Sequence, residues 1–255
     1  METDNPYRPH PDLTVRQRGQ AWAVHVFTTL GIVACMLALK AVLTDQPSHA
    51  IFWLLLTLLI DGVDGPIARA VETERRVPRI DGYLLDLIID YVACVIVPAA
   101  FMWQFDVVPK NNWGVVILSI MVFTSAIWFA RKDMETPDHW FRGFPAAWNI
   151  VGPLLFIMEA RTWVGASLTL VLSVLQLTSL PYPHMARARW MRKWTALGGT
   201  CWIGGIVLGM FAYPHHWYAV RLLIYIGTAY FLYLSIAKLV HDQRAKRGPS
   251  VPEGV

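Results

Sequence analysis

Charged residues are scarce in this chain. They make up 16% of its 255 residues, whereas 55% of the residues are hydrophobic and the mean hydropathy is +0.41. Because a soluble globular domain has about 25% charged residues, the composition excludes an ordinary soluble protein. The formal net charge of +4 is too small to indicate binding to nucleic acid. The composition indicates a chain that crosses a membrane several times.

Cysteine is also scarce, and its positions show no metal-binding pattern. Cys35, Cys94 and Cys201 lie inside apolar segments, with no spacing typical of a zinc site or of a disulfide framework. We expect them to be small core residues. A signal peptide is not visible, because the first twenty residues are polar and contain three prolines. Low-complexity tracts, internal repeats and a separate soluble domain are not visible either.

Eight apolar segments follow one another along the chain. Most approach the twenty or so residues that a helix needs to cross a bilayer. Pro153 lies within the short fifth segment, where we expect it to leave a carbonyl unpaired and to kink the helix. The predicted fold is therefore all-α, a polytopic membrane helix bundle of about eight transmembrane helices. The approximate ranges are 21–43, 49–69, 82–105, 113–130, 144–158, 162–180, 196–213 and 217–240.

Lysine and arginine are unevenly distributed between these segments. Connections with three or four basic residues alternate with connections that have one or none. The positive-inside rule then places both termini in the cytoplasm. We expect a cytoplasmic N-terminal segment (1–20), a membrane domain (21–240) and a cytoplasmic tail (241–255), with a short interfacial helix at 13–20.

Residues 61–90 carry four carboxylates between two apolar segments. Asp61 and Asp64 are three residues apart and Asp86 and Asp90 are four apart, so each pair shares one face of a helix. The charge pattern places the first pair at the end of a helix that reaches the cytoplasmic face, and the second at the start of the helix that leaves it. The stretch reads D-x2-D-G-x2-A-R-x12-G-x3-D-x3-D, and its other fixed positions are Gly65, Ala68, Arg69 and Gly82.

Two helices that each offer two carboxylates suit hard divalent cations, which prefer oxygen ligands. A pair of such ions can hold the oxygens of a phosphoryl group during an in-line displacement. The alternative is that these acids are ordinary helix-end residues in contact with water. Acids within membrane segments are costly and usually functional, which favours the metal site.

This pattern resembles the signature of the CDP-alcohol phosphotransferase family. The gap of twelve residues between Arg69 and Gly82 is longer than the usual family spacing. Together with the DG-x2-DG opening, it is similar to the variant in bacterial phosphatidylcholine synthases. The resemblance implies transfer of the phosphatidyl group of CDP-diacylglycerol to choline, with release of CMP, at the cytoplasmic side of the bacterial inner membrane.

The resemblance also implies roles for particular residues. Two Mn2+ or Mg2+ ions would be held by Asp61, Asp64, Asp86 and Asp90, and Asp90 would also be the general base for the choline hydroxyl. The nucleotide site would comprise Asp61, Gly65, Ala68, Arg69 and Gly82.

Three further sites each have a plainer alternative. His25 and Thr28 either contact the nucleotide or are helix-start residues bonded to backbone. Trp148 and Asn149 either form part of a choline cage or belong to an interfacial aromatic belt. Arg187 either binds phosphate or lies in a basic loop against anionic headgroups.

Two other functions and one partner remain open. The same chemistry with serine, inositol or glycerol phosphate as the acceptor is one alternative. A transporter or channel is the other, but its acids should be spread through the membrane depth, whereas these cluster at one face. Besides CDP-diacylglycerol, choline and membrane lipids, a second copy of the chain is a possible partner. The glycine-rich seventh segment offers a close-packing surface, either for a homodimer or within one chain.

Overall fold

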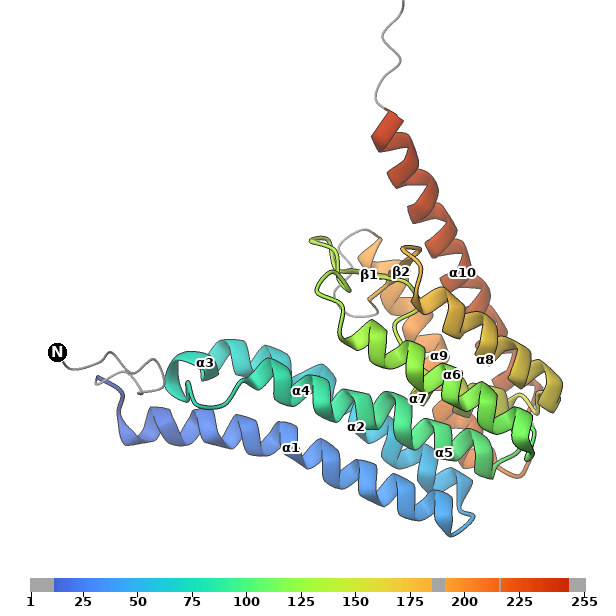
Figure 1. Cartoon of the computed structure of the whole chain (residues 1–255), viewed down its shortest axis with the longest axis horizontal. Coiled ribbons are helices and arrows are strands. Elements are labelled where there is room, and N and C mark those ends of the chain that lie inside the picture. Colours follow the sequence, from blue (N-terminus) through green and yellow to red (C-terminus); the bar gives the residue numbers. More distant parts are fainter. Residues whose placement is uncertain (1–11, 185–190, 216, 248–255) are drawn as a thin grey trace, which may run out of the picture. The chain divides into compact units, whose positions relative to one another are not determined.

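The computed structural model describes residues 12–184, 191–215 and 217–247, and they are almost entirely helical (Figure 1). The chain divides into two compact units. Unit 1 comprises the residues up to 107 together with 148–153, and unit 2 comprises 108–147 and the residues from 154 onward.

Six helical segments in the described part of the chain are long and apolar enough to cross a membrane. The fifth and sixth expected segments are shorter: α7 (Trp148–Ile157) has 10 residues and α8 (Thr162–Gln176) has 15. At a rise of 1.5 Å per residue they extend about 15 and 22 Å, less than the ~30 Å hydrocarbon core. Eight crossings and cytoplasmic termini therefore stay predictions. The six segments are Val15–Leu43, Pro47–Val71, Gly82–Gln104, Asn112–Phe129, Arg192–Ala212 and Tyr218–Arg244.

Unit 1 is built on two long helices, α1 (Val15–Leu43) and α2 (Pro47–Val71), which pack against each other. Thr14 begins α1 with a capping box: its hydroxyl accepts from the backbone N–H of Gln17, and the Gln17 side chain accepts from the backbone N–H of Thr14. Because α1 starts at Val15, the stretch 13–20 contributes its first turns and forms no separate interfacial helix.

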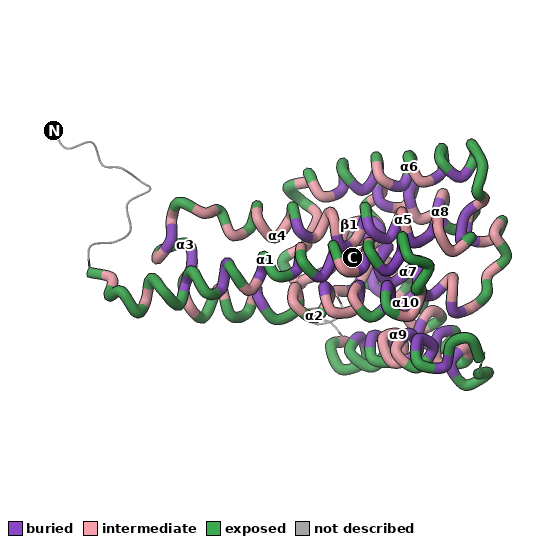
Figure 2. The backbone as a smooth tube through the Cα atoms, turned by 90° about the horizontal axis from the view of Figure 1, so that it is seen from below, coloured by how far each residue is buried: buried purple, intermediate pink, exposed green. Residues whose placement is uncertain are grey.

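Small residues form the buried side of α1. Ala34, Ala38 and Ala41 are buried, and Figure 2 shows such positions recurring along the helix between exposed ones. Small side chains let the backbones of membrane helices approach closely. This packing holds α2, and the acidic residues it carries, against α1.

The rest of unit 1 returns along the same two helices. A single turn, α3 (Thr73–Arg76), leads to α4 (Gly82–Tyr91), followed by a π-helix, η1 (Val92–Ile96), and by α5 (Val97–Gln104). Helix α4, the π-helix η1 and α5 make one continuous helical rod, as the apolar segment 82–105 predicts. The elements α4, η1 and α5 all contact α1.

Unit 2 contains α6 (Asn112–Phe129), α8, α9 (Arg192–Ala212) and α10 (Tyr218–Arg247). Helix α10 continues past residue 240, where the membrane domain was expected to end. The division of the chain into a domain and two tails stays a prediction.

The described part of the chain is nearly all-α, as predicted, and a small antiparallel sheet is the addition that the sequence did not predict. Strand β1 (Trp140–Arg142) pairs with β2 (Pro181–Pro183), and Phe141 lies opposite Tyr182. The turn after β1 requires glycine, because Gly143 has a φ of +81° and a Cβ there would lie 2.4 Å from the carbonyl oxygen of Gln176. Helix α7 consequently starts at Trp148, four residues later than its apolar segment.

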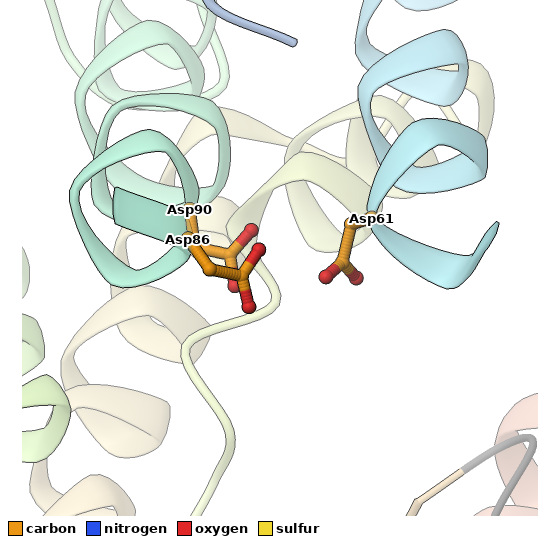
Figure 3. A group of neighbouring side chains, drawn as sticks. All are labelled: Asp61, Asp86 and Asp90. Carbon is orange, nitrogen blue, oxygen red and sulfur yellow. The ribbon is translucent and has the colours of Figure 1, made fainter. Parts of the chain in front are cut away.

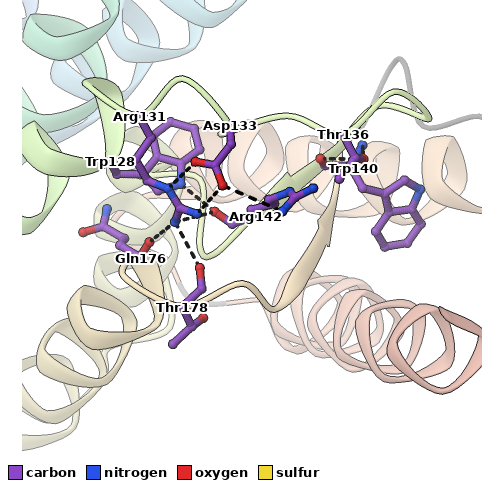
Figure 4. A network of polar contacts seen from close by, with 8 residues as sticks. All are labelled: Trp128, Arg131, Asp133, Thr136, Trp140, Arg142, Gln176 and Thr178. Atoms are coloured by element: carbon purple, nitrogen blue, oxygen red, sulfur yellow. Dashed lines mark hydrogen bonds and ion pairs between the residues drawn. The ribbon is translucent and has the colours of Figure 1, made fainter. Parts of the chain in front are cut away.

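Polar contacts hold this sheet to the helices of unit 2 (Figure 4). Nη1 of Arg131 donates to the carbonyls of Gln176 and Thr178, at 3.3 and 3.1 Å, and so caps the C-terminal end of α8. The buried side chain of Gln176 accepts from the Thr124 hydroxyl at 2.7 Å and donates to Ser125 at 3.0 Å. These bonds satisfy a polar group that would be costly to bury alone.

Candidate functional site

Three of the four acidic residues predicted as metal ligands lie together in unit 1. Asp61 comes from α2, and Asp86 and Asp90 come from α4, one turn apart. Each offers one carboxylate oxygen, and these oxygens all lie within 4.8 Å of one another. Figure 3 shows Asp86 and Asp90 on the same side of their helix, facing Asp61. The three side chains are half-buried and remain accessible.

Local sequence sets the register of α4. The carboxylate of Asp81 accepts from the backbone N–H of Leu84 at 2.9 Å and caps the helix, which starts at Gly82. Asp86 and Asp90 therefore lie one and two turns into α4. The sequence suggested that Asp61 lies at the end of a helix, and this was wrong. Helix α2 continues for ten residues beyond Asp61, to Val71, with Pro66 inside it.

Asp64 is not a member of this group. It follows Asp61 by about one turn on α2, its residue surface is only 4% exposed, and it is not among the three residues whose oxygens cluster. The structure thus brings together three of the four predicted ligands.

The donor set fits a hard divalent cation. At about 4.8 Å, each pair of ionised carboxylates repels by roughly 3 kcal/mol at an effective dielectric constant of about 20. A bound cation would offset this repulsion. Because all three donors are carboxylates, the group suits Mg2+ or Mn2+ better than a softer metal.

Two candidate nucleotide residues, one on α1 and one on α4, are in contact. A Cβ on Gly82 would lie 3.3 Å from Cε1 of His25, so the imidazole packs on the first residue of α4. His25 is buried, and its Nε2 has no hydrogen-bond partner among the residues that the structure describes. Thr28 is also buried, whereas Thr29 makes the backbone bond to the His25 carbonyl, at 2.7 Å.

The remaining nucleotide candidates continue along α2 beyond the acids. Gly65 and Ala68 are half-buried, whereas Arg69, in the last turn of the helix, is exposed. An exposed guanidinium at this end of α2 is available to a phosphate group.

The predicted choline residues begin α7, within unit 1. Trp148 is fully buried, at 0% exposure, and Asn149 is 2% exposed. In the described part of the chain, Oδ1 of Asn149 has no hydrogen-bond partner. Arg187, the predicted phosphate ligand, lies outside the described residues.

The π-helix directly after Asp90 was not predicted. The N–H of Val97 bonds to the carbonyl of Val92, five residues back, where a regular helix would use a carbonyl four residues back. Pro98 is the signal in the sequence, because proline cannot donate a backbone hydrogen bond and disturbs the preceding turn.

Unit 2 holds a second group of charged residues, beside a cavity of about 560 Å³. Nζ of Lys238, on α10, lies 2.7 Å from a carboxylate oxygen of Asp138 and 2.9 Å from one of Asp242. It also lies 5.7 Å from the ring centroid of Trp140. These contacts tie α10 to the segment that carries β1.

Comparison with known proteins gives a consistent family. The model of the CDP-alcohol phosphatidyltransferase family matches residues 23–226. The phosphatidylcholine synthase of Pseudomonas aeruginosa is 35% identical over 177 residues, which cover 69% of this chain and 74% of that protein. The phosphatidylcholine synthase of Rhizobium meliloti is 34% identical over 235 residues, which cover 89% and 92%.

The matched region contains the candidate metal ligands. It begins two residues before His25 and extends into α10, so it includes α2, α4 and their carboxylates. The chain belongs to the CDP-alcohol phosphatidyltransferase family.

Proposed function

We propose that this protein is a phosphatidylcholine synthase, which transfers the phosphatidyl group of CDP-diacylglycerol to choline and releases CMP. The observation that carries the proposal is the cluster of Asp61, Asp86 and Asp90. It occurs in a chain that aligns over most of its length with phosphatidylcholine synthases. The six long apolar helices are in keeping with substrates and products that are membrane lipids.

The carboxylates would hold the divalent metal on which enzymes of this family generally depend. We assign Asp61, Asp86 and Asp90 to Mn2+ or Mg2+, and we assign Asp64 to the second of two ions. Bound ions of this kind neutralise the charge of a diphosphate during its displacement.

Asp90 is assigned the proton transfer. Its carboxylate accepts the proton of the choline hydroxyl, whose oxygen forms a bond to the phosphorus that carries diacylglycerol. The bond between that phosphorus and the CMP oxygen breaks, and CMP leaves with the electron pair. Such a direct displacement depends on positioning and on charge neutralisation, and it needs no covalent intermediate on the protein.

The nucleotide is assigned to the surroundings of the acids. Arg69 would bind phosphate through its guanidinium, while Gly65 and Ala68 would leave room for the ligand along α2. His25 and Thr28 would contact the nucleotide beside Gly82, and the buried Nε2 of His25 supports this assignment because it lacks a partner among the described residues. Arg187 would bind phosphate.

The acceptor is assigned to the start of α7. Choline has no N–H group to donate, so its trimethylammonium group is best held by aromatic faces. Trp148 would supply such a face, and Oδ1 of Asn149 would accept a hydrogen bond or provide a partial negative charge. The full burial of Trp148 requires this face to open when choline enters.

The proposal also includes a location. The alternation of basic residues supports a position of the acids on the cytoplasmic side of the inner membrane. Water-soluble choline would reach them from the cytoplasm, and CDP-diacylglycerol would reach them from the bilayer. A homodimer is proposed on the precedent of the family alone.

Lipid analysis tests the function. A bacterial host that lacks phosphatidylcholine would express this protein with choline supplied, and the headgroups of its lipids would be identified. We expect phosphatidylcholine with the native protein and none with Asp86→Asn. The purified protein would then be given CDP-diacylglycerol with choline, serine, inositol or glycerol phosphate in turn. Faster turnover of an acceptor other than choline would overturn the assignment of the substrate.

A further inference from the structure

The helix that carries Asp86 and Asp90 changes its hydrogen-bonding pattern just after the second acid. Regular α-helix extends from Gly82 to Tyr91, the π-helix occupies Val92–Ile96, and regular helix resumes at Val97. The bond from the Val97 N–H to the Val92 carbonyl spans five residues. This turn therefore contains one more residue than a turn of regular helix.

Pro98 gives a covalent reason for this pattern. Proline has no N–H, so it cannot bond to the carbonyl of Cys94, four residues earlier, and its ring crowds that carbonyl. A π-turn placed immediately before proline accommodates both effects within a continuous helix. Pro98 is buried, and so are Ala93 and Val95 within the π-helix, whereas Ile96 is exposed, so one side of the turn packs against its neighbours.

The extra residue separates two faces that a regular helix would superimpose. Asp86, Asp90, Val97 and Phe101 follow one another at intervals of four, seven and four residues. These intervals place all four on one face of an unbroken α-helix. The carboxylates and the apolar packing residues of the rod would then compete for the same surroundings.

The structure gives the two sets different surroundings. Asp86 and Asp90 are half-buried and face Asp61 on α2 (Figure 3). Val97 is 1% exposed and Phe101 is 0% exposed. A Cβ on Gly152 of α7 would lie 3.5 Å from the ring of Phe101, so this side chain packs against α7. One added residue rotates the following helix by about 100° relative to the preceding one, which is enough to separate the faces.

We propose that the π-helix Val92–Ile96 sets the rotation of α4 that brings Asp86 and Asp90 opposite Asp61, and that Pro98 is the positioning residue of this metal centre. Pro98 touches neither substrate nor metal in this role. The inference deepens the proposed function, on which its catalytic part rests, while its geometric part stands on the structure alone.

Cross-linking tests the geometry without catalysis. In a chain whose three native cysteines are replaced by alanine, Asp61→Cys and Asp90→Cys would be combined and oxidised. The free thiols would then be counted from the gel shift with a maleimide polymer. We expect efficient disulfide formation, and a loss of at least about fivefold when Pro98→Ala is added. Pro47→Ala is the matched control, because proline at the first position of α2 has no intrahelical bond to block.

Metal dependence tests the consequence for catalysis. In the otherwise native protein, we expect Pro98→Ala to raise the Mn2+ concentration for half-maximal activity about tenfold. At saturating Mn2+, the KM for CDP-diacylglycerol should change little, which a general packing defect would not produce. A native protein that makes no phosphatidylcholine would refute the proposed function, yet would leave the cross-linking result valid.

A second variant guards against a folding defect. Deletion of residue 94 in the Pro98→Ala chain removes the extra residue, so a regular helix then holds Val97 and Phe101 at the angle to Asp90 that the π-helix gives, and the 61–90 cross-link should recover. An unchanged cross-link in Pro98→Ala, or no recovery of the cross-link when residue 94 is also deleted, would overturn the proposal. If neither variant accumulated in the membrane while Pro47→Ala did, Pro98 would be a residue required for folding, which would also overturn its assignment as a positioning residue.

Discussion

At the scale of single residues, the candidate site brings together the carboxylates of Asp61, Asp86 and Asp90. Three ionised groups within 4.8 Å of one another destabilise the protein unless a cation binds between them. The repulsion between Asp61 and the other two carboxylates arises because residues of two helices, α2 and α4, come together. Neither helix alone would experience it.

Amide substitutions test the ligands one at a time. We expect Asp61→Asn, Asp64→Asn and Asp86→Asn each to lower turnover by at least about 100-fold, because a neutral amide is a weaker ligand for a hard cation. Each variant should still accumulate in the membrane. Asp106→Asn is the control, since Asp106 is exposed and asparagine also tolerates its φ of 58°. Near-normal activity of any one variant in saturating Mn2+ would remove that residue from the ligand set.

The acceptor site is tested at Trp148 and Asn149. We expect Trp148→Ala to raise the KM for choline about tenfold, or ~1.4 kcal/mol, with a much smaller change for CDP-diacylglycerol. Trp148→Phe should recover part of the loss, and Asn149→Ala should also affect choline more than the lipid. Equal weakening of both substrates by Trp148→Ala would make Trp148 a packing residue, in line with its complete burial.

At the scale of helices and strands, unit 2 shows how one ion pair connects elements far apart in sequence. Lys238 on α10 is buried, and its ammonium bonds to Asp138, 100 residues earlier, as well as to Asp242 on its own helix. The Lys238 side chain is 10% exposed, but the Asp138 carboxylate is 37% exposed, so solvent screens the pair and we expect its contribution to stability to be modest.

The pH dependence of this pair follows from Asp138. Burial raises the pKa of Asp138, but hydrogen bonds from Lys238 and Thr136 outweigh that effect and hold its pKa below its usual value of about 4. The ion pair therefore stabilises the folded state at pH values above the usual aspartate pKa of about 4. Its contribution is lost as the pH falls through the lowered pKa that Asp138 has in the folded protein.

Thermal unfolding in detergent measures this contribution. At pH 7 we expect the native protein to unfold at a higher temperature than Asp138→Asn. The difference should shrink as the pH is lowered from 5 toward 3. Glu74→Gln, at an exposed position of α3, should show no such convergence. A constant difference between native protein and Asp138→Asn down to pH 3 would contradict the pairing.

At the scale of the whole molecule, two glycines of α9 pack against α10 of the same chain. A Cβ at Gly205 would lie 2.8 Å from Ile224, and a Cβ at Gly198 would lie 2.8 Å from Tyr230, both on α10. Close approach of α9 and α10 therefore accounts for these glycines. Packing within one chain, one of the two alternatives that the sequence left open, is therefore observed for Gly198 and Gly205, and the homodimer stays a prediction.

The topology is tested by thiol labelling of intact cells. In a chain without its native cysteines, we expect Lys110→Cys and Arg161→Cys to react with an impermeant maleimide, whereas Arg79→Cys should react only after lysis. These three residues are exposed in the structure, so a missing signal would report the side of the membrane. Labelling of Arg79→Cys but not of Lys110→Cys on intact cells would invert the orientation and place the acids outside.

The sequence by itself determined the long apolar helices and the spacing of the carboxylates along them. Backbone groups in a bilayer must bond within their own helix, so each long apolar segment could be placed from local composition. The D-x2-D and D-x3-D spacings also follow from helical periodicity, which is a local property, and they indicated one acidic face on α2 and another on α4.

Only the tertiary structure decided which acids meet. Asp61 clusters with Asp86 and Asp90 and Asp64 is not in that cluster, because membership depends on how α2 and α4 are each placed and rotated on α1. The π-helix after Asp90, the pairing of β1 with β2, and the burial of Trp148 likewise arise from contacts between distant segments. No local pattern encodes such contacts, since each depends on the shape of a partner elsewhere in the chain.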